Sequence, residues 1–126
     1  MRFLPVLPLA MWLAACAPLP LEPPSLVEVT SRPAERALLA GLRAYDDAQY
    51  PEAEKQLSRA LGAGLLSPKD RAAAHKHLAF IYCTSNRNSE CEAAFRAARQ
   101  ADPGFELSKS ESGHPLWGQT YQRSRL

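Results

Sequence analysis

The chain has 126 residues, a length that suits one domain, and a formal net charge of +2 at pH 7. One positive charge, Arg2, lies in a segment that we expect to be removed, so the mature protein would be nearly neutral. A nearly neutral chain without a basic stripe is not expected to attract nucleic acid through its electrostatic field. Much of the hydrophobic content is alanine, which suits closely packed helices.

Residues 1–15 have the layout of a secretory signal peptide. One positive charge is followed by an apolar run that is too short to span a membrane. Leu13-Ala14-Ala15-Cys16 then resembles the lipobox of bacterial lipoproteins, in which the cysteine is lipidated and becomes the first mature residue. The resemblance implies that Cys16 carries a diacylglyceryl group and fatty acyl chains such as palmitate. The alternative is an ordinary signal-peptidase site beside an incidental cysteine.

The segment after the lipobox predicts an anchored, tethered protein. In Gram-negative lipoproteins, an aspartate after the lipidated cysteine favours the inner membrane. Ala17 therefore implies the outer membrane, facing the periplasm, if the source is such a bacterium. Residues 17–33 contain five prolines, which favour extended backbone, so we predict that residues 16–31 form a semi-stiff tether. The alternation in Leu26-Val27-Glu28-Val29 is compatible with a short strand or a segment that docks in a groove.

Residues 32–126 are predicted to form one helical domain. A first helix is expected from a cap at Ser31 to about Ala48, and a second from a first turn containing Pro51 to about Leu61. A third helix is expected to start at Ser67-Pro68-Lys69-Asp70, where the serine caps the helix and the aspartate lies in its first turn. Ser89 and Glu92 have the spacing of a capping box at the start of a fourth helix.

A repeated apolar pattern relates these helices. In Leu78 to Pro103, one helical face carries Leu78, Ala79 and Tyr82, and a second carries Cys91, Phe95 and Ala98. This spacing resembles the tetratricopeptide repeat, a helix-turn-helix unit of about 34 residues. The pattern also occurs upstream at a constant offset of 38 residues, where Gly41, Tyr50, Ala53, Leu57 and Ala60 correspond to Ala79, Asn88, Cys91, Phe95 and Ala98.

The resemblance implies an all-α fold of two tetratricopeptide-like helix-turn-helix units, an α-solenoid, closed by a C-terminal capping helix. The four additional residues relative to the usual period fall in residues 62–67. Pro115 is predicted as the first residue of the cap, with Leu116, Trp117, Thr120 and Tyr121 on one side. An exposed aromatic anchor for a partner is the alternative role of the tail. An unrelated four-helix bundle is the alternative fold.

The cysteines predict one disulfide. Cys83 and Cys91 remain as a pair in an oxidising compartment once Cys16 is lipidated. They fall at the end of one helix and in the first turn of the next, so their Cα atoms can approach to bridging distance. A bridge over so short a loop would stabilise the domain by roughly 2–3 kcal/mol. Two buried thiols are the alternative. No metal ligand set is apparent, because neither a histidine nor a second cysteine pair stands at ligand spacing.

No catalytic constellation is apparent in the sequence. His75 and His77 are two residues apart and point away from each other on a helix. The acidic residues near 46–54 are typical of a solvated edge. No phosphate-binding loop, nucleotide fingerprint or nucleophile elbow is present. We therefore predict a non-enzyme without a cofactor, metal or small-molecule substrate.

The resemblance also implies a protein-binding groove on the first helix of each unit. The corresponding positions are Leu38, Leu42, Tyr45, Lys76 and Phe80, an apolar strip with one cation that suits a peptide. The alternative is that the chain's own tail or tether covers the strip.

The complete layout of lipobox, proline-rich tether, repeats, cysteine pair and the tail DPGFEL…GHPLWG is similar to small lipoproteins associated with type VI secretion. That resemblance implies an anchored scaffold that binds a protein of a secretion apparatus. Two other classes are compatible with the layout. One is a pilotin that escorts a partner to the outer membrane, and the other is a regulatory accessory of peptidoglycan enzymes.

Overall fold

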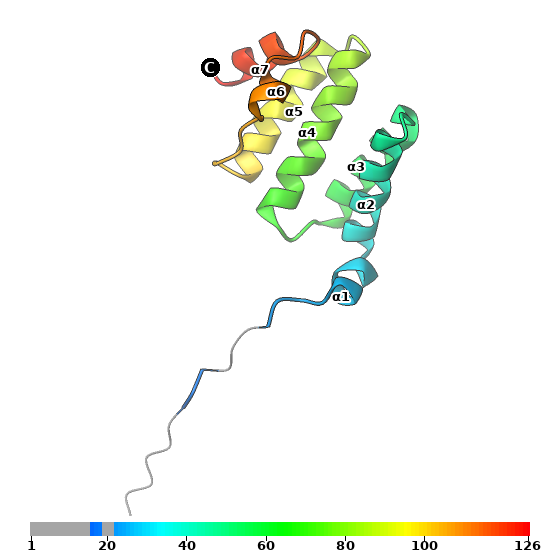
Figure 1. Cartoon of the computed structure of the whole chain (residues 1–126), viewed down its shortest axis with the longest axis vertical. Helices are drawn as coiled ribbons and strands as arrows, with labels where there is room; N and C mark the ends of the chain where they lie inside the picture. Colours follow the sequence, from blue (N-terminus) through cyan, green and yellow to red (C-terminus); the bar gives the residue numbers. More distant parts are fainter. Residues whose placement is uncertain (1–15, 19–21) are drawn as a thin grey trace, which may run out of the picture.

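The computed structural model describes residues 16–18 and 22–126, and this part of the chain contains helices and no strands (Figure 1). The predicted all-α class is confirmed for these residues. Along them the helices are α1 (Leu26–Ser31), α2 (Pro33–Asp46), α3 (Tyr50–Ala63), α4 (Pro68–Thr84), α5 (Asn88–Ala101), α6 (Lys109–Ser112) and α7 (Gly118–Ser124). The predicted signal peptide, residues 1–15, lies outside the described residues.

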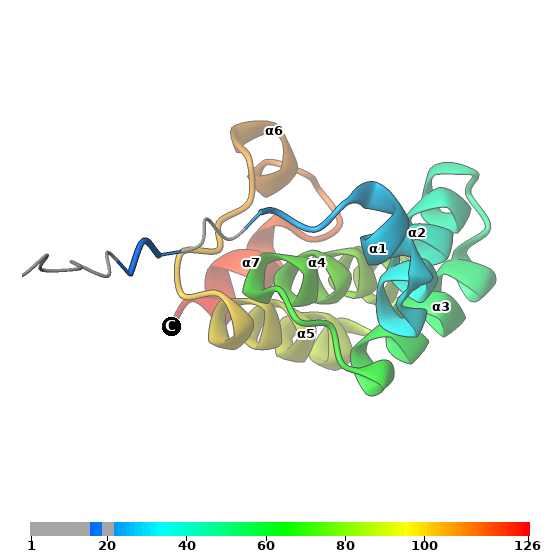
Figure 2. The same cartoon turned by 90° about the horizontal axis from the view of Figure 1, so that it is seen from below.

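The four longest helices form two hairpins that lie side by side. α2 packs against α3, and α4 packs against α5. α3 also packs against α4 and joins the hairpins, as Figures 1 and 2 show from two directions. α7 packs on α5, and α1 packs on the start of the first hairpin. Each helix therefore packs mainly on helices that are near to it in the sequence.

Two clusters of buried side chains hold the helices together. The first, which includes Leu57, lies between α2, α3 and α4. The second, which includes Phe95, lies between α4, α5 and the C-terminal segment. Tyr45 and Tyr82 are partly buried and pack against both clusters. These two tyrosines connect the interior of one hairpin with that of the next.

α2 and α3 approach each other closely at Gly41. A Cβ at this position would lie 2.8 Å from Leu57 Cγ and 3.1 Å from Leu57 N. Leu57 is fully buried, so its side chain has little room to move away. The absence of a side chain at Gly41 therefore sets the distance between α2 and α3.

The turns of the two hairpins share one backbone conformation, 38 residues apart. Ala48 and Asn86 have positive φ angles of 58° and 62°. The residues after them, Gln49 and Arg87, have φ and ψ of −91° and 69°, and of −94° and 65°. Each of their N–H groups donates over 2.8 Å to the carbonyl five residues earlier. The constant offset in the apolar pattern is thus also a constant offset in backbone geometry.

Ala48→Gly is expected to raise the free energy of unfolding by about 0.5–1 kcal/mol. A residue with a Cβ destabilises the folded chain by roughly 1–2 kcal/mol when it adopts the left-handed conformation, and glycine removes this cost. The greater conformational freedom of glycine in the unfolded chain offsets part of the stabilisation. Urea unfolding of the two chains measures the difference. Asn86→Ala, which introduces alanine at the equivalent turn, should lower the free energy of unfolding. A stability loss in Ala48→Gly would contradict the geometry of this turn.

The structure corrects two expectations near the start of the domain. The short strand compatible with Leu26-Val27-Glu28-Val29 is wrong, because this segment belongs to α1, which Ser25 caps. The predicted cap at Ser31 is also wrong, since Ser31 is the last residue of α1. The break falls at Arg32, whose backbone is extended because the residue before a proline disfavours the helical conformation. Pro33 then opens α2.

Other helices begin or end at or near the residues predicted from their prolines, caps and glycines. Pro51 lies in the first turn of α3, and Ser67 caps α4 by accepting the N–H of Asp70 at 3.3 Å. α3 continues to Ala63, two residues beyond its predicted end, and Gly64 follows with a φ of 90°. A glycine at this left-handed position is a common way to end a helix.

The predicted capping box at Ser89 and Glu92 is wrong. α5 begins at Asn88 with Arg87 in the cap position and no side-chain cap, so Ser89 already lies inside the helix. The left-handed turn residue before Arg87 sets the start of the helix, and it does so without a serine hydroxyl. The Glu92 side chain instead forms ion pairs with arginines of α5 and α7.

The C-terminal segment also departs from its prediction. α7 begins at Gly118, three residues after Pro115, and Trp117 occupies its cap position. The additional one-turn helix α6 precedes it and starts with a complete capping box between Ser108 and Glu111. Trp117 is buried as a cap requires, whereas Leu116 is 56% exposed.

Candidate recognition face

The face formed by α2 and α4 contains the five residues predicted to line a peptide-binding groove. Tyr45 and Phe80 come together, with ring centroids 6.4 Å apart, and the Lys76 ammonium lies 5.8 Å from the Phe80 ring. Leu38 is 6% exposed and Phe80 is 3% exposed, so neither lines an open surface. Leu42 and Tyr45 are partly buried and remain partly accessible. The face is therefore partly accessible at Leu42 and Tyr45, here called the open half, and covered at Phe80, here called the closed half.

Trp117 of the chain's own tail covers Phe80. The two rings stack with centroids 4.1 Å apart and planes inclined by 22°. His114 stacks in turn on Trp117, at 3.4 Å and 3°. The indole N–H donates over 2.8 Å to the backbone carbonyl of Glu111, which ties the ring to α6. The tail therefore occupies the α4 half of the predicted groove, the alternative that the sequence left open.

An ion pair fixes α6 to the same face. The Lys76 ammonium lies 3.0 Å from a carboxylate oxygen of Glu111, and Figure 2 shows α6 standing over α4. The other carboxylate oxygen accepts the backbone N–H of Ser108 at 2.9 Å. Partial burial would raise the pKa of Glu111, but the hydrogen bonds from Ser108 and Lys76 outweigh it and lower that pKa. Glu111 is thus held ionised on the face.

The contacts of the tail are expected to weaken in acid. Since the pKa of Glu111 is lowered, its contribution is complete above the ordinary pKa of glutamate, about 4.3, and is lost as the pH falls through the lowered value. In a chain that begins at Cys16, Trp117 is the only tryptophan, so its fluorescence reports the change. We expect a red shift of emission below about pH 4 while helical circular dichroism persists.

Glu111→Gln provides the control for this titration. The variant should lack the acid transition and show partly shifted emission already at pH 7. The expected loss at pH 7 is at most about 1 kcal/mol, because the ion pair is partly exposed. An unchanged acid transition in Glu111→Gln would assign the titration to another group.

His77 lies between the open and closed halves of the face. Its ring stands edge-on to Tyr45, with centroids 5.0 Å apart, and 5.9 Å from the Phe80 ring. Its Nδ1 lies 2.8 Å from the carbonyl oxygen of Ala73, so Nδ1–H is the donor. Burial lowers the pKa of His77, which keeps the ring neutral at pH 7 and leaves Nε2 without a proton. His75, on the same helix, does not share this face. It lines a surface groove between α4 and α5 together with Tyr82, as the two-residue spacing from His77 predicts.

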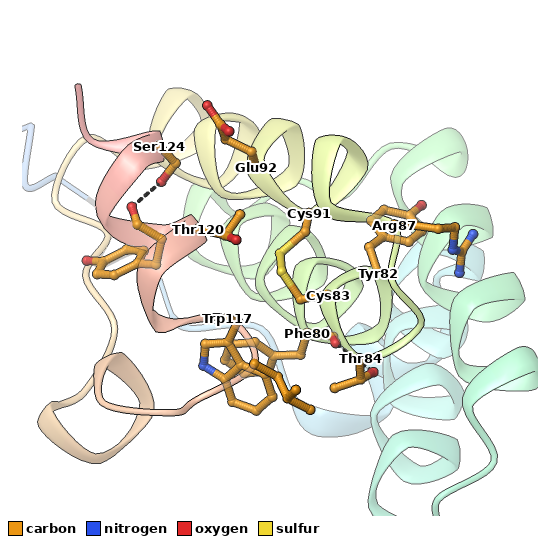
Figure 3. Close-up of a disulfide and its surroundings, with 12 residues drawn as sticks. Phe80, Tyr82, Cys83, Thr84, Arg87, Cys91, Glu92, Trp117, Thr120 and Ser124 are labelled. Carbon is orange, nitrogen blue, oxygen red and sulfur yellow. Dashed lines mark hydrogen bonds between the residues drawn. A yellow bond between two sulfur atoms is a disulfide. The ribbon is translucent and has the colours of Figure 1, made fainter.

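The cysteine pair fixes the end of α4 to the start of α5. Cys83 Sγ and Cys91 Sγ are 1.98 Å apart, and the Cα atoms are 5.2 Å apart, as in a disulfide. Figure 3 shows this bond beside the stacked rings of Phe80 and Trp117. The bridge therefore holds the helix end that carries Phe80.

A second set of contacts fixes the two hairpins to each other. Arg87, in the turn between α4 and α5, donates to both carboxylate oxygens of Glu54 on α3, at 2.9 and 2.7 Å. Its guanidinium carbon also lies 4.5 Å from the ring centroid of Tyr82 (Figure 3). The hydrogen bonds from Arg87 lower the pKa of Glu54 in spite of partial burial, so the pair is ionised at pH 7. Arg87 thereby links the turn between α4 and α5 to α3 of the other hairpin.

Sequence reasoning missed Glu111 and His77 as parts of this face. The Ser108-Lys109-Ser110-Glu111 capping box was a local signal for α6 that could have been used. The pairing of Glu111 with Lys76 spans 35 residues and has no local signal. His77 follows Lys76 in the sequence, but its spacing from His75 indicates only that the two histidines point away from each other.

Other predicted site features can be placed only in part. Cys16 is exposed and takes part in no disulfide among the described residues. Over the same residues, no three or more histidine, cysteine, aspartate or glutamate side chains gather as a metal-binding group. In the described part of the chain, no helix has the length and apolar character needed to cross a membrane.

No protein-family model, curated protein or solved structure matches the chain.

Proposed function

We propose that this protein is a lipid-anchored adaptor whose helical domain follows the tetratricopeptide plan and binds a protein of a cell-envelope machine. A type VI secretion apparatus is the first candidate, because the layout of the chain is similar to lipoproteins associated with it. In this proposal the protein is not an enzyme and uses no cofactor, and its recognition face takes a segment of another protein. It would act at the outer membrane, facing the periplasm.

The observation that carries the proposal is the repetition of one hairpin at an offset of 38 residues. The interior positions of the first hairpin, Ala53, Leu57 and Ala60, and their equivalents Cys91, Phe95 and Ala98 are all fully buried. The left-handed residues Ala48 and Asn86 follow the same offset. A chance pair of helix hairpins has no physical reason to keep sequence and backbone in one register. Stacked helix hairpins of this kind present extended surfaces that suit protein segments.

The chemistry of the open half of the face supports a protein partner. Leu42 and Tyr45 supply partly exposed apolar surface, and Asp46 and Thr84 at the helix ends are exposed. Such a mixture suits the alternating apolar and polar side chains of a bound peptide.

The anchor rests on Cys16 and the residues after it. A thioether-linked diacylglyceryl group with a further acyl chain would bind the bilayer stably, since each buried methylene contributes about 0.8 kcal/mol. The proline-rich segment would then separate the helical domain from the lipid surface.

Complementation of a deletion strain tests the proposal. Cys16→Ser should release the protein from the outer membrane, abolish palmitate incorporation and impair type VI secretion. Leu42→Glu should retain anchoring but impair secretion, while Ala40→Glu, at an exposed position that lines the surface pocket between α2 and α3, should behave as the unaltered protein. Normal secretion without the protein would refute the type VI assignment. Mislocalisation of a secretin would then identify a pilotin, and altered peptidoglycan synthesis an accessory of cell-wall enzymes.

A further inference from the structure

We propose that the closed half of the face, centred on Lys76 and Phe80, binds a partner segment that carries a carboxylate and a tryptophan-like aromatic ring. The chain's own residues 108–117, here called the tail loop, occupy this position and must be displaced. This inference rests on the proposed adaptor function and specifies the chemistry of its partner.

The tail loop shows which groups the closed half accepts. Its Glu111 carboxylate pairs with the Lys76 ammonium at 3.0 Å, and its Trp117 ring stacks on Phe80 at 4.1 Å. The Lys76 ammonium also lies over the Phe80 ring, so the cationic and aromatic subsites adjoin. An acidic residue followed at a short distance by an aromatic residue satisfies both subsites at once.

The tail loop is attached to the domain in a way that permits it to leave. α6 has four residues and none of them is buried. Both ends of the loop are fixed elsewhere, since the Leu107 N–H donates to the Tyr121 hydroxyl at 3.2 Å. α7 is held independently through Arg99, whose guanidinium donates to the backbone carbonyl and the hydroxyl of Ser124. Residues 108–117 can therefore lift while α7 remains on α5, and the one buried side chain that must leave with them is Trp117, which is 8% exposed and belongs to the same cluster as Phe80.

A partner segment has an advantage that the tail loop lacks. Tyr45 adjoins the closed half through its ring contacts with His77 and Phe80, and both Tyr45 and Leu42 are partly exposed. A longer segment can continue across them. The tail loop, tethered at high effective concentration, then excludes weaker ligands.

Gly118 offers a way to open the face without altering it. A Cβ at this position would lie 2.6 Å from the backbone oxygen of Ser112, so Gly118→Ala must separate the end of α6 from the start of α7. Combined with Glu111→Gln it gives an opened chain with Lys76 and Phe80 unchanged. Glu111→Gln alone is the milder version, because it removes one partly exposed ion pair and leaves the backbone as it is.

The test uses the mature chain, residues 16–126 with Cys16→Ser, and a fluorescent peptide with the sequence of residues 107–118. Fluorescence anisotropy should show at least tenfold tighter binding to the opened chain than to the unaltered chain. Peptides carrying Trp117→Ala or Glu111→Gln should lose at least tenfold in affinity for the opened chain. Lys76→Glu in the opened chain should abolish binding of the original peptide, and Glu111→Lys in the peptide should restore it.

Equal affinity of the peptide for the opened and unaltered chains would overturn the inference. Unchanged affinity of the peptide for an opened chain that carries Lys76→Glu would also overturn it. Circular dichroism verifies that each variant is folded, and the milder Glu111→Gln chain replaces the double variant if the latter is not. Because purified components are used, a negative result refutes this inference alone. The adaptor function is tested separately by secretion in the complemented strain.

Discussion

Phe95→Ala is expected to lower the free energy of unfolding by about 3–5 kcal/mol, enough to unfold much of a small domain. The Phe95 side chain is fully buried and contacts both Phe80 and Tyr121, with centroids 6.1 and 5.3 Å apart. Its removal leaves a cavity between α4, α5 and α7, and the loss of stability is large because the surrounding helices can move inward only in part. Urea unfolding measures the loss.

Leu116→Ala is the matched control for this substitution. Leu116 also carries a large apolar side chain, but it is 56% exposed, so its truncation should change the free energy of unfolding by less than about 0.5 kcal/mol. Similar losses in Phe95→Ala and Leu116→Ala would contradict the position of the core.

Reduction of the disulfide is expected to lower the free energy of unfolding by roughly 2–3 kcal/mol, the loop-entropy value for a bridge with a sequence separation of 8. Both cysteines are buried, and the bridge holds the end of α4 that carries Phe80. We therefore expect Trp117 emission to shift on reduction, before the whole domain unfolds. Unfolding curves with and without dithiothreitol, read by circular dichroism and fluorescence, separate the two effects.

The double variant Cys83→Ala/Cys91→Ala is the control for reduction. It should have the lower stability of the reduced chain and should not respond to dithiothreitol. A chain whose stability is the same with and without reductant would show that the pair is not bonded in solution.

Local patterns in the sequence were sufficient to predict much of the fold. The repeated spacing of small and apolar residues gave the two hairpins, since a helical face is fixed by residues three and four apart. The helix starts predicted from Ser67 and Pro51 are confirmed, because both residues act within one turn of their own position. The capping box at Ser89 failed because the left-handed Asn86 had already set the start of α5. A capping-box pattern is thus informative only where no preceding turn fixes the helix start.

The state of the recognition face could not be predicted in this way. Periodicity assigned Phe80 and Lys76 to one face of α4, but it carries no information on which distant segment covers that face. The decisive contacts join Lys76 to Glu111 and Phe80 to Trp117, more than 30 residues away in sequence. Only the packing of the complete domain determines whether the tail lies there.

The most direct test of the adaptor account is photo-cross-linking in living cells from position 42 of the anchored protein. Incorporation of a photoreactive residue in place of Leu42 should yield a cross-link to one protein of the type VI apparatus. The same residue in place of Ala40 should not. Cross-links of equal yield from both positions, or none from position 42 in actively secreting cells, would contradict a binding face on α2 and α4.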